Sequence, residues 1–479
     1  MLILRSPWPL SFGARVCAVN RMLLMVREKG LPTRVHCVGV AGGGLSAFAG
    51  LLASCGHEVS GSDGQSAPAA LAAAGVSLYR GHRAENLGQA QLLIRSAAVP
   101  DENVEVQAAR DAGVPVLKYS EALGRLMATR QGLAVAGTHG KTSTTAMAAH
   151  LLQAAGAAPA WIIGGQPQGM AAYAWGDRGP MVVEACEYDR SFLNLSYDVA
   201  LVTGITVDHL DCFGDWDGVL RAFGAFCAGL PDGGQLVLGP GVAEQLGSQL
   251  PTHCGVHSID DLLPLQSARA VGGGWEAIMG PEGQYSLRLP VLARHDLDNL
   301  RCALVAASCC GVSLDRLLPG VESFAGVARR LQDLGEVSLP GGGTVRLIDD
   351  FAHHPDALQA ALSTARAHFP GRRVMGVFQP HQVCRTEDLF SAFAQVLRGF
   401  DQVALCDIFL ARDAHPERAE SVCEALAEAA GPNVARVGPA LDAEDSAGEL
   451  FRPDDVCVVM GAGDIDGLAH RIVRAAARP

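Results

Sequence analysis

A glycine-containing loop between two regular segments constrains the fold of this chain most. Residues 133–136 are an apolar run that predicts a buried strand, and residues 144–153 predict a helix. Between them stands Gly137-Thr-His-Gly140-Lys141-Thr142-Ser143. A strand that turns through glycines into a helix points backbone N–H groups and the positive end of the helix dipole at one spot, which favours a phosphate. The loop therefore predicts an α/β fold with a nucleotide-phosphate site.

The loop also carries two side chains that suit nucleotide phosphates. Lys141 can neutralise phosphate charge, and Thr142 can offer a hydroxyl to Mg²⁺. Lysine is otherwise rare, since the chain contains only Lys29, Lys118 and Lys141. The spacing is two residues shorter than in the usual phosphate loop, so an ordinary glycine-rich turn is the alternative interpretation.

Composition narrows the class of protein. The 479 residues predict two to four domains, and contents of 49% hydrophobic and 18% charged residues indicate a folded chain. A net charge of −13 argues against nonspecific nucleic-acid or anionic-membrane binding. The 14 cysteines form no CxxC pair, which predicts reduced thiols in the cytoplasm. We expect no membrane span, and we expect residues 1–34 to be a poorly ordered extension with Met22 or Met25 as alternative starts.

Strands and helices alternate along the chain in three blocks, which predicts mainly parallel sheets covered by helices. The first block has a strand from Arg34, a glycine turn and a second strand before Asp63, and the second block begins near Gln131 with the phosphate loop. The third block begins near Leu318, with apolar strands at residues 344–348, 373–378, 402–406 and 455–460. Glycine-rich turns are expected at residues 272–274 and 340–343.

Polar clusters follow these strands, and the carboxyl ends of parallel strands share one edge of a sheet. In the first block, Gly42-Gly43-Gly44 and Asp63 could approach a diphosphate and a ribose, with a structural turn as the alternative. In the second block, Glu184 and the Asp208-His209 pair suit a divalent cation. Solvated acids and a structural histidine are the alternatives there.

The third block has four such clusters, which predicts that they converge on one crevice, with scattered capping residues as the alternative. They are Asp349-Asp350-Phe-Ala-His353-His354, Gln379-Pro-His381 with Arg385, Asp407, and Gly461-Ala-Gly463-Asp464. Arg329-Arg330, just before the first of these apolar strands, could meet a transferred phosphoryl group.

Taken in order, these motifs resemble those of the Mur ligases of peptidoglycan synthesis, from His36 to Asp464. Gly81-His82, His295 with Asn299, and the Gly-x-x-Arg-Arg run ending at Arg330 complete the pattern. The resemblance implies three domains: a Rossmann-like UDP-substrate domain at 35–130, a P-loop NTPase-like ATP domain at 131–317 and a Rossmann-like amino-acid and nucleotide domain at 318–479. The motifs are most similar to those of the branch that joins L-alanine to UDP-N-acetylmuramate.

The resemblance also implies roles for individual residues. The UDP part would meet Gly42, Gly43, Gly44, Ser46, Asp63 and Ser96. ATP would meet Gly137, Thr138, His139, Gly140, Lys141, Thr142, Ser143, His295, Asn299 and Asp350. Mg²⁺ would be held by Thr142, Glu184 and His209, and the amino acid by Phe351, His354, His381 and Arg385. The catalytic set would be Lys141, Glu184, His209, Arg329, Arg330, His353 and Arg385.

The implied reaction has two steps. The substrate carboxylate attacks the γ-phosphate of ATP to give an acyl phosphate, and the amine of alanine then displaces phosphate. Because the acyl phosphate hydrolyses readily, domain closure is expected to exclude water. The implied partners are ATP, UDP-N-acetylmuramate and L-alanine in a cytoplasmic monomer or homodimer, with no nucleic acid.

The chain departs from the family pattern near the expected amino-acid pocket. Phe351 stands where a tyrosine is usual, and Gln382 and Val383 stand where Arg-Tyr is usual. Asp296 and Gly204 replace asparagines, and no lysine follows Lys141 that could be carbamylated. A sister ligase with another acceptor (a murein tripeptide, glycine or serine) and a non-catalytic nucleotide-binding relative are therefore the alternatives.

Overall fold

The computed structural model describes residues 30–208, 210–339, 342–411, 413, 415–465 and 467–476. The chain divides into two compact units. Unit 1 comprises Met1–Gln266, Ile278–Leu287 and Asp298–Phe324, and unit 2 comprises Ser267–Ala277, Arg288–Leu297 and Ala325–Pro479. The predicted extension lies mostly outside the described residues, and Arg34 already begins the first strand.

The first sheet of unit 1 is parallel and has the order β3-β2-β1-β4-β5. Its strands are β1 (Arg34–Val38), β2 (Glu58–Asp63), β3 (Ser77–Arg80), β4 (Leu92–Arg95) and β5 (Val116–Lys118). Its helical segments are α2 (Gly43–Ser54), α3 (Ala69–Ala73), η1 (Ala84–Leu87), α4 (Val104–Asp111) and α5 (Tyr119–Met127). The crossovers between parallel strands bring the loops after β1, β2 and β4 to the same edge.

The second sheet of unit 1 has the order β12-β11-β10-β6-β9-β7-β8, and only the pairing of β8 with β7 is antiparallel. Its strands are β6 (Gly132–Ala136), β7 (Ala160–Ile162), β8 (Tyr173–Ala174), β9 (Met181–Glu184), β10 (Val199–Val202), β11 (Gln235–Leu238) and β12 (Gly255–Ser258). Strand β6 lies in the middle and is buried throughout. A continuous apolar strand is what a helix-covered parallel sheet requires.

Helical segments follow β6, β9, β10, β11 and β12 of this sheet, and three more come later in the chain, after residue 295. They are α6 (Lys141–Ala154), η2 (Tyr188–Asn194), α7 (Leu210–Phe213), α8 (Trp216–Ala228), α9 (Val242–Leu246), η3 (Gly247–Gln249), α10 (Ile259–Leu262), α11 (Asp296–Cys309), α12 (Leu314–Leu317) and η4 (Leu318–Ser323). Helix α6 begins at Lys141, three residues before the predicted start. The loop lysine is therefore the first helical residue, with Gly140 as the N-cap.

Unit 2 is built on a six-stranded sheet of order β16-β17-β21-β18-β19-β20, in which only β16 and β17 pair antiparallel. The strands are β16 (Gln332–Ser338), β17 (Thr344–Asp350), β18 (Val374–Phe378), β19 (Gln402–Cys406), β20 (Val434–Gly438) and β21 (Val456–Met460). The helical segments are α13 (Pro355–His368), α14 (Val383–Asp388), α15 (Phe390–Leu397), η5 (Pro416–Arg418), α16 (Ala419–Ala430), α17 (Ala443–Gly448) and α18 (Leu468–Ala476).

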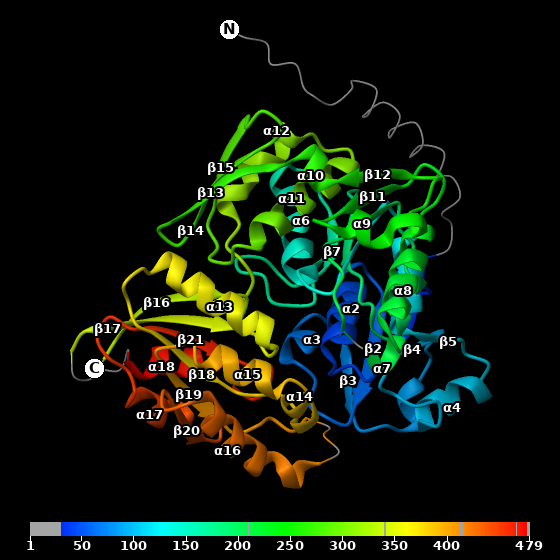
Figure 1. Cartoon of the computed structure of the whole chain (residues 1–479). Coiled ribbons are helices and arrows are strands. Elements are labelled where there is room, and N and C mark those ends of the chain that lie inside the picture. Colours follow the sequence, from blue (N-terminus) through cyan, green and yellow to red (C-terminus); the bar gives the residue numbers. More distant parts are fainter. Residues whose placement is uncertain are drawn as a thin grey trace. The chain divides into compact units, whose positions relative to one another are not determined.

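Alternate residues of these strands enter two separate cores. In β18, Val374 and Phe378 pack with α13, α15 and α16, whereas Met375 and Val377 pack with α17 and α18. Figure 1 shows α13, α14 and α15 on one side of this sheet and α17 and α18 on the other. The fold class is thus confirmed: three mostly parallel, helix-covered sheets. The exact boundaries of three separate domains stay a prediction.

A smaller three-stranded sheet contributes residues to both units. Its strands, in spatial order, are β13 (Leu265–Val271), β14 (Gly274–Met279) and β15 (Tyr285–Leu289). The glycine-rich turn predicted at residues 272–274 separates β13 from β14. Another turn is predicted at residues 340–343, between the antiparallel strands β16 and β17, and its residues 340 and 341 lie outside the described part.

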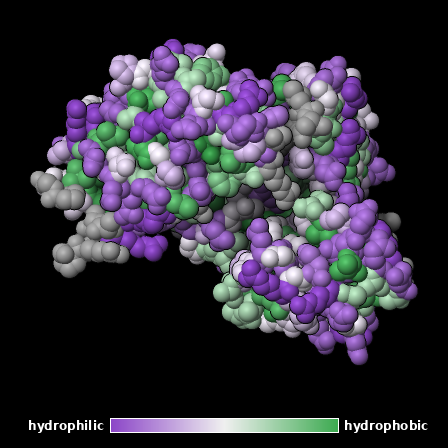
Figure 2. All heavy atoms as spheres, turned by 90° about the horizontal axis from the view of Figure 1, so that it is seen from below, coloured by the Kyte–Doolittle hydropathy of each residue, from purple (hydrophilic) through white to green (hydrophobic). Residues whose placement is uncertain are grey.

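Within the described ranges, no helix combines the length and apolar character that a bilayer crossing needs. On the face drawn in Figure 2, hydrophobic residues form small patches among hydrophilic ones. All cysteines within the described ranges are free.

Candidate active site

The phosphate loop has the strand–turn–helix geometry that the sequence predicts. It leaves the carboxyl end of β6 and enters α6 through Gly137 and Gly140, whose φ angles are 135° and 79°. A Cβ on Gly137 would lie 2.0 Å from Thr203 Oγ1, and one on Gly140 would lie 2.4 Å from Asn299 Oδ1. Both positions therefore need glycine for conformation and for space.

Lys141 folds back over its own loop. Its Nζ donates to Gly137 O at 2.6 Å, to Thr138 O at 3.1 Å and to Glu187 Oε1 at 2.9 Å. The ammonium group thus has two loop carbonyls that phosphate oxygens could replace. Glu187 is a site residue that was not singled out from the sequence, although it lies three residues after Glu184.

Thr142 and Glu184 meet at the adjacent strand end. Thr142 Oγ1 lies 3.1 Å and 3.0 Å from the two carboxylate oxygens of Glu184, which ends β9. The backbone N–H of Gly164, after β7, donates to Glu184 Oε2 at 3.0 Å. These contacts bring together two of the three predicted metal ligands. The third, His209, lies outside the described residues.

The donor set fits a hard cation. Carboxylate and hydroxyl oxygens are the ligands that Mg²⁺ prefers, and Mg²⁺ usually takes only one or two protein carboxylates together with phosphate oxygens and water. Within the ranges the structure describes, no group of three or more His, Cys, Asp and Glu side chains could hold a metal ion. An ion at Thr142 and Glu184 would therefore be expected to take phosphate oxygens and water as further ligands.

The remaining loop residues are fixed by the chain that follows β10. Thr138 N donates to Gly204 O at 2.9 Å, and Thr138 Oγ1 donates to Thr206 O at 3.2 Å. His139 is exposed, with Nε2 3.3 Å from Thr206 Oγ1. Ser143 is buried in the first turn of α6. Thr138 therefore anchors the phosphate loop to the chain after β10, while His139 is exposed.

The predicted uridine-diphosphate residues gather at the carboxyl edge of the first sheet. Gly42 is the N-cap of α2, and Gly42, Gly43 and Gly44 are exposed. Asp63 Oδ2 accepts a hydrogen bond from Ala41 N at 2.9 Å, so this carboxylate holds the glycine loop. Ser46 is half-buried in the first turn of α2, and a Cβ on Gly39 would lie 2.9 Å from Ser96 Cβ. All six predicted residues therefore lie at the carboxyl ends of β1, β2 and β4: Gly42, Gly43, Gly44 and Ser46 at the start of α2, Asp63 as the last residue of β2, and Ser96 directly after β4.

A buried carboxylate organises the same edge and was not predicted. Glu105, in the first turn of α4, is fully buried and accepts from Ser62 Oγ, Arg83 N and Asn86 Nδ2. Burial by itself raises the pKa of Glu105, but hydrogen bonds involving His36, Ser62, Arg83 and Asn86 outweigh it and lower the pKa to about 2. The network fixes the loop after β3. Its partners come from β1, β2 and that loop, so no local motif announces it.

In unit 2, Asp350 and the two arginines surround the end of β17. Arg329 Nη2 donates to Gly461 O at 2.5 Å, and the Arg329 and Arg330 guanidinium carbons lie 5.1 Å and 5.4 Å from the Phe351 ring centre. Burial raises the pKa of Asp350 to about 6, although the positive charges of Arg330 and His295 act in the opposite sense. His295 thus acts electrostatically on Asp350 within unit 2, and Asn299 lies beside the phosphate loop in unit 1.

The predicted amino-acid residues follow β17 and β18. His353 Nδ1 lies 2.9 Å from Phe351 O, and the His353 and His381 rings lie 6.0 Å apart. Burial lowers the pKa of His353 to about 4, although the hydrogen bond to Phe351 O opposes the shift, and the positive charge of Arg385 lowers it further. Burial and Arg385 also lower the pKa of His381. Both rings are therefore uncharged at neutral pH.

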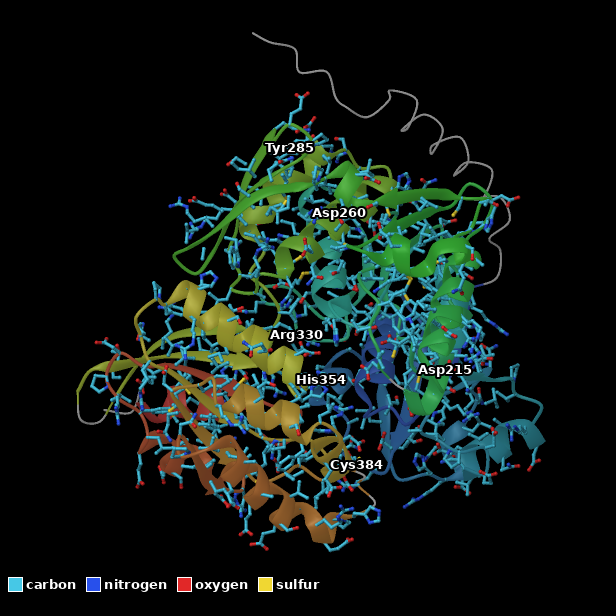
Figure 3. All side chains as sticks on the ribbon, viewed as in Figure 1. Asp215, Asp260, Tyr285, Arg330, His354 and Cys384 are labelled. Carbon is cyan, nitrogen blue, oxygen red and sulfur yellow. The ribbon has the colours of Figure 1, made fainter. Side chains whose placement is uncertain are left out.

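His354 and Gln382 have structural tasks beside this cluster. His354 is the N-cap of α13, and its Nδ1 accepts from Asp356 N at 3.3 Å. Gln382 precedes α14 with a φ of 67°, and its N–H donates to Phe409 O. Figure 3 labels Arg330 before β16, His354 after β17, and Cys384, the neighbour of Arg385, after β18. The His354-Pro355 pair is a recognisable helix start that the sequence interpretation as a ligand overlooked.

The other strand-end clusters of the third block hold one another. Gln379 Nε2 donates to Asp464 Oδ1, and Gln379 Oε1 accepts from Ile465 N at 3.0 Å. Asp407 Oδ1 accepts from Arg436 Nη2 at 2.8 Å. Gln379 thus ties the ends of β18 and β21 together, as capping residues would, and Asp407 is paired at the neighbouring strand.

Comparisons with known proteins agree with this arrangement. Three family models match successive parts of the chain: "Mur ligase family, catalytic domain" at residues 34–131, "Mur ligase middle domain" at 135–307 and "Mur ligase, glutamate ligase domain" at 329–463. The UDP-N-acetylmuramate–L-alanine ligase of Xanthomonas campestris pv. campestris is 35% identical over 459 residues, covering 92% of this chain and 95% of its own. That of Xylella fastidiosa is 36% identical over 455 residues with the same coverage.

Solved structures share the fold over nearly the whole chain. The UDP-N-acetylmuramate-alanine ligase MurC of Thermotoga maritima has a TM-score of 0.75 and 27% identity, covering 92% of this chain and 98% of its own. A murein peptide ligase of Psychrobacter arcticus has a TM-score of 0.66 and 21% identity, covering 94% and 99%. The second likeness concerns the fold alone. With three matching family models and relatives more than one-third identical over most of its length, the chain belongs to the Mur ligase family.

Proposed function

We propose that this protein is an ATP-dependent ligase that joins L-alanine to the lactyl carboxylate of UDP-N-acetylmuramate in peptidoglycan precursor synthesis. The observation that carries the proposal is the assembly of Lys141, Thr142 and Glu184 at one strand-to-helix turn. Relatives named UDP-N-acetylmuramate–L-alanine ligase, similar over more than nine-tenths of the chain, support the substrate pair.

The first step activates the carboxylate. A carboxylate oxygen attacks the γ-phosphorus of ATP, the bond to the β-phosphate oxygen breaks, and ADP leaves. Lys141 exchanges its contacts with Gly137 O and Thr138 O for phosphate oxygens, and N–H groups at the start of α6 face the same phosphates. Arg329 and Arg330 are proposed to meet the transferred group.

Thr142 and Glu184, with His209, are proposed to hold Mg²⁺. Bound there, Mg²⁺ supplies charge neutralisation between the phosphates and the attacking carboxylate. Within the chain, Gly164 N fixes the carboxylate of Glu184 while Thr142 Oγ1 contacts both of its oxygens. The pair is therefore held in position before any substrate arrives.

The second step forms the amide. The amine attacks the acyl carbon, phosphate leaves, and the nitrogen loses a proton. The amine enters as an ammonium ion, so it must lose a first proton to solvent before it can attack, and the proton lost as the amide forms goes to the departing phosphate. The uncharged His353 ring can accept a hydrogen bond from the incoming amine. Arg385 is proposed to meet the amino-acid carboxylate, and Phe351, His354 and His381 to complete its surroundings.

The acceptor is the part of this proposal that most needs an experiment. Phe351, Gln382 and Val383 keep a sister ligase for glycine, serine or a murein tripeptide as the second candidate. ADP release should be measured with UDP-N-acetylmuramate and a panel of L-alanine, glycine, L-serine and the tripeptide. L-Alanine should give the highest kcat/KM, and a higher value for any other acceptor would assign the chain to a sister activity.

Two further expectations belong to the same proposal. Free cysteines within the described ranges suit a reducing compartment, so we place the reaction in the cytoplasm. We infer a monomer or a homodimer, which sedimentation of the purified chain would distinguish. A non-catalytic relative is disfavoured because Lys141, Thr142 and Glu184 are all present and lie together at the start of α6 and the end of β9.

A further inference from the structure

We propose that Glu187 makes the phosphate loop select metal-bound nucleotide over free nucleotide, by neutralising Lys141 in the empty site. The inference rests on the proposed ATP and Mg²⁺ roles of Lys141, Thr142 and Glu184. It assigns to Glu187 a specificity-determining role that its place in the sequence does not reveal.

Glu187 forms a buried ion pair with Lys141 of the phosphate loop. Glu187 Oε1 lies 2.9 Å from Lys141 Nζ, and the side chains of the pair are only 4% and 14% exposed. The other two acceptors of Nζ, Gly137 O and Thr138 O, also carry partial negative charge. Little solvent screens this ion pair, so its electrostatic effect on a nearby phosphate is larger than that of a surface pair.

The second argument is that Glu187 is held in place by the fold. The two residues after Tyr188, Asp189 and Arg190, both have a φ of 53°, and Arg190 N donates to Glu187 O. Phe192 follows and is fully buried, stacked on Phe226 at 4.9 Å between ring centres. A tight turn anchored in the core keeps the backbone of Glu187 beside the loop.

The carboxylate of Glu187 has a hydrogen-bond partner on one oxygen and, within the described residues, none on the other. Within the described residues, Glu187 Oε2 is buried and has no hydrogen-bond partner. Glu105, the other buried glutamate of unit 1 described above, receives donors on both oxygens. An unpaired buried carboxylate oxygen is destabilising. A purely structural carboxylate would be expected to have donors on both oxygens, as Glu105 has.

The fourth argument is the charge of the empty site. Lys141 contributes one positive charge, and Glu184 and Glu187 each contribute one negative charge, so these three side chains sum to −1. A free nucleotide polyphosphate therefore approaches a site whose lysine is already neutralised. A divalent cation on Thr142 and Glu184 changes the same sum to +1, so the metal complex of the nucleotide is favoured.

The test replaces Glu187 by glutamine. The amide keeps an oxygen that can accept from Lys141 Nζ but removes the charge. Titration calorimetry should measure the Kd of ADP in EDTA and again with Mg²⁺ in excess. In Glu187→Gln, we expect ADP in EDTA to bind about tenfold more tightly than in the wild type. The Kd in EDTA divided by the Kd in Mg²⁺ should therefore fall.

Two matched variants make the outcome specific. Asp198→Asn alters a buried carboxylate that accepts from Gly132 N at the opposite end of β6, and it should leave both Kd values unchanged. Glu184→Gln should abolish the effect of Mg²⁺ on ADP binding. If Mg²⁺ still tightens ADP binding in Glu184→Gln, the proposed metal site is wrong, and the inference about Glu187 is overturned with it.

The inference fails alone if Glu184→Gln loses the Mg²⁺ effect while Glu187→Gln binds ADP in EDTA no more tightly than the wild type. Should Glu187→Gln fold poorly, Lys141→Gln gives an independent measurement, because it leaves both carboxylates uncompensated. In Lys141→Gln, ADP in EDTA should bind more weakly than in the wild type, and the Kd in EDTA divided by the Kd in Mg²⁺ should rise. An unchanged ratio in Lys141→Gln overturns the role of this charge pair.

Discussion

Thr142 Oγ1 lies within 3.1 Å of both carboxylate oxygens of Glu184, a residue 42 positions later in the chain. The contact joins the first turn of α6, which follows β6, to the end of β9, and β6 and β9 are adjacent parallel strands. It places a hydroxyl and a carboxylate together next to the lysine of the phosphate loop. The proposed chemistry depends on this local assembly.

Lys141→Ala should abolish ligation without affecting the UDP-substrate site. The loop loses the ammonium group of Lys141, so charge developing during phosphoryl transfer is no longer neutralised there. ADP release should fall by at least about a hundredfold. Calorimetric binding of UDP-N-acetylmuramate, proposed to use the first sheet, should stay within about twofold of the wild type. Full turnover in this variant would refute the assignment of the loop.

Gly164→Ala should impair catalysis through Glu184. A Cβ at this position would lie 2.4 Å from Glu184 Oε2, so the carboxylate must move away from its place beside Thr142. We expect kcat to fall by about tenfold or more, because small misplacements of site groups are costly. Gly448→Ala is the control, since a Cβ there meets no atom within 4 Å. Equal kcat values for the two variants would contradict the role of Gly164.

Asp350→Asn should change how stability depends on pH. Burial raises the pKa of Asp350 to about 6, whereas aspartate in an unfolded chain titrates near 3.9. The folded chain therefore binds this proton more tightly, and the associated stability is present below about pH 4 and is lost as pH rises through about 6. Asparagine lacks this loss. The Tm of the variant relative to wild type should rise between pH 4.5 and 7.5, and a constant or falling difference would contradict the shift.

Arg385→Ala should weaken use of the amino acid more than use of ATP. Arg385 lies close enough to His353 and His381 for its charge to lower the pKa of both rings, which places it in the proposed acceptor pocket. We expect the KM for L-alanine to rise about tenfold or more and the KM for ATP to change little. Arg398→Ala is the control, because Arg398 stands at the end of α15 and its guanidinium donates to the backbone at Ala429 O. Equal rises in both KM values would remove Arg385 from the pocket.

Local pattern predicted the parts of the site that lie on one turn of chain. The apolar run before Gly137 and the glycines around Lys141 define the loop, because strand, turn and helix are set by neighbouring residues. Glu184 was found because strand ends converge in parallel sheets. Helix α6 nevertheless begins at Lys141 rather than at residue 144, since the glycine at its N-cap allows an immediate start.

Contacts between residues far apart in the chain could not be predicted from the sequence. Glu187 pairs with Lys141 across 46 positions, and Glu105 collects partners from β1, β2 and the loop after β3. Neither contact follows from spacing or hydrophobic pattern, because side-chain direction depends on how the sheets twist and pack. Strand β20 was missed because its residues are only half-buried at the edge of the sheet.

Release of ADP as a function of both co-substrates tests the central claim most directly. With ATP and Mg²⁺ present, the account predicts rapid ADP release only when UDP-N-acetylmuramate and L-alanine are supplied together, with one ADP formed per amide bond. ADP release that ignores L-alanine, or that needs a different amine, would contradict the assigned reaction.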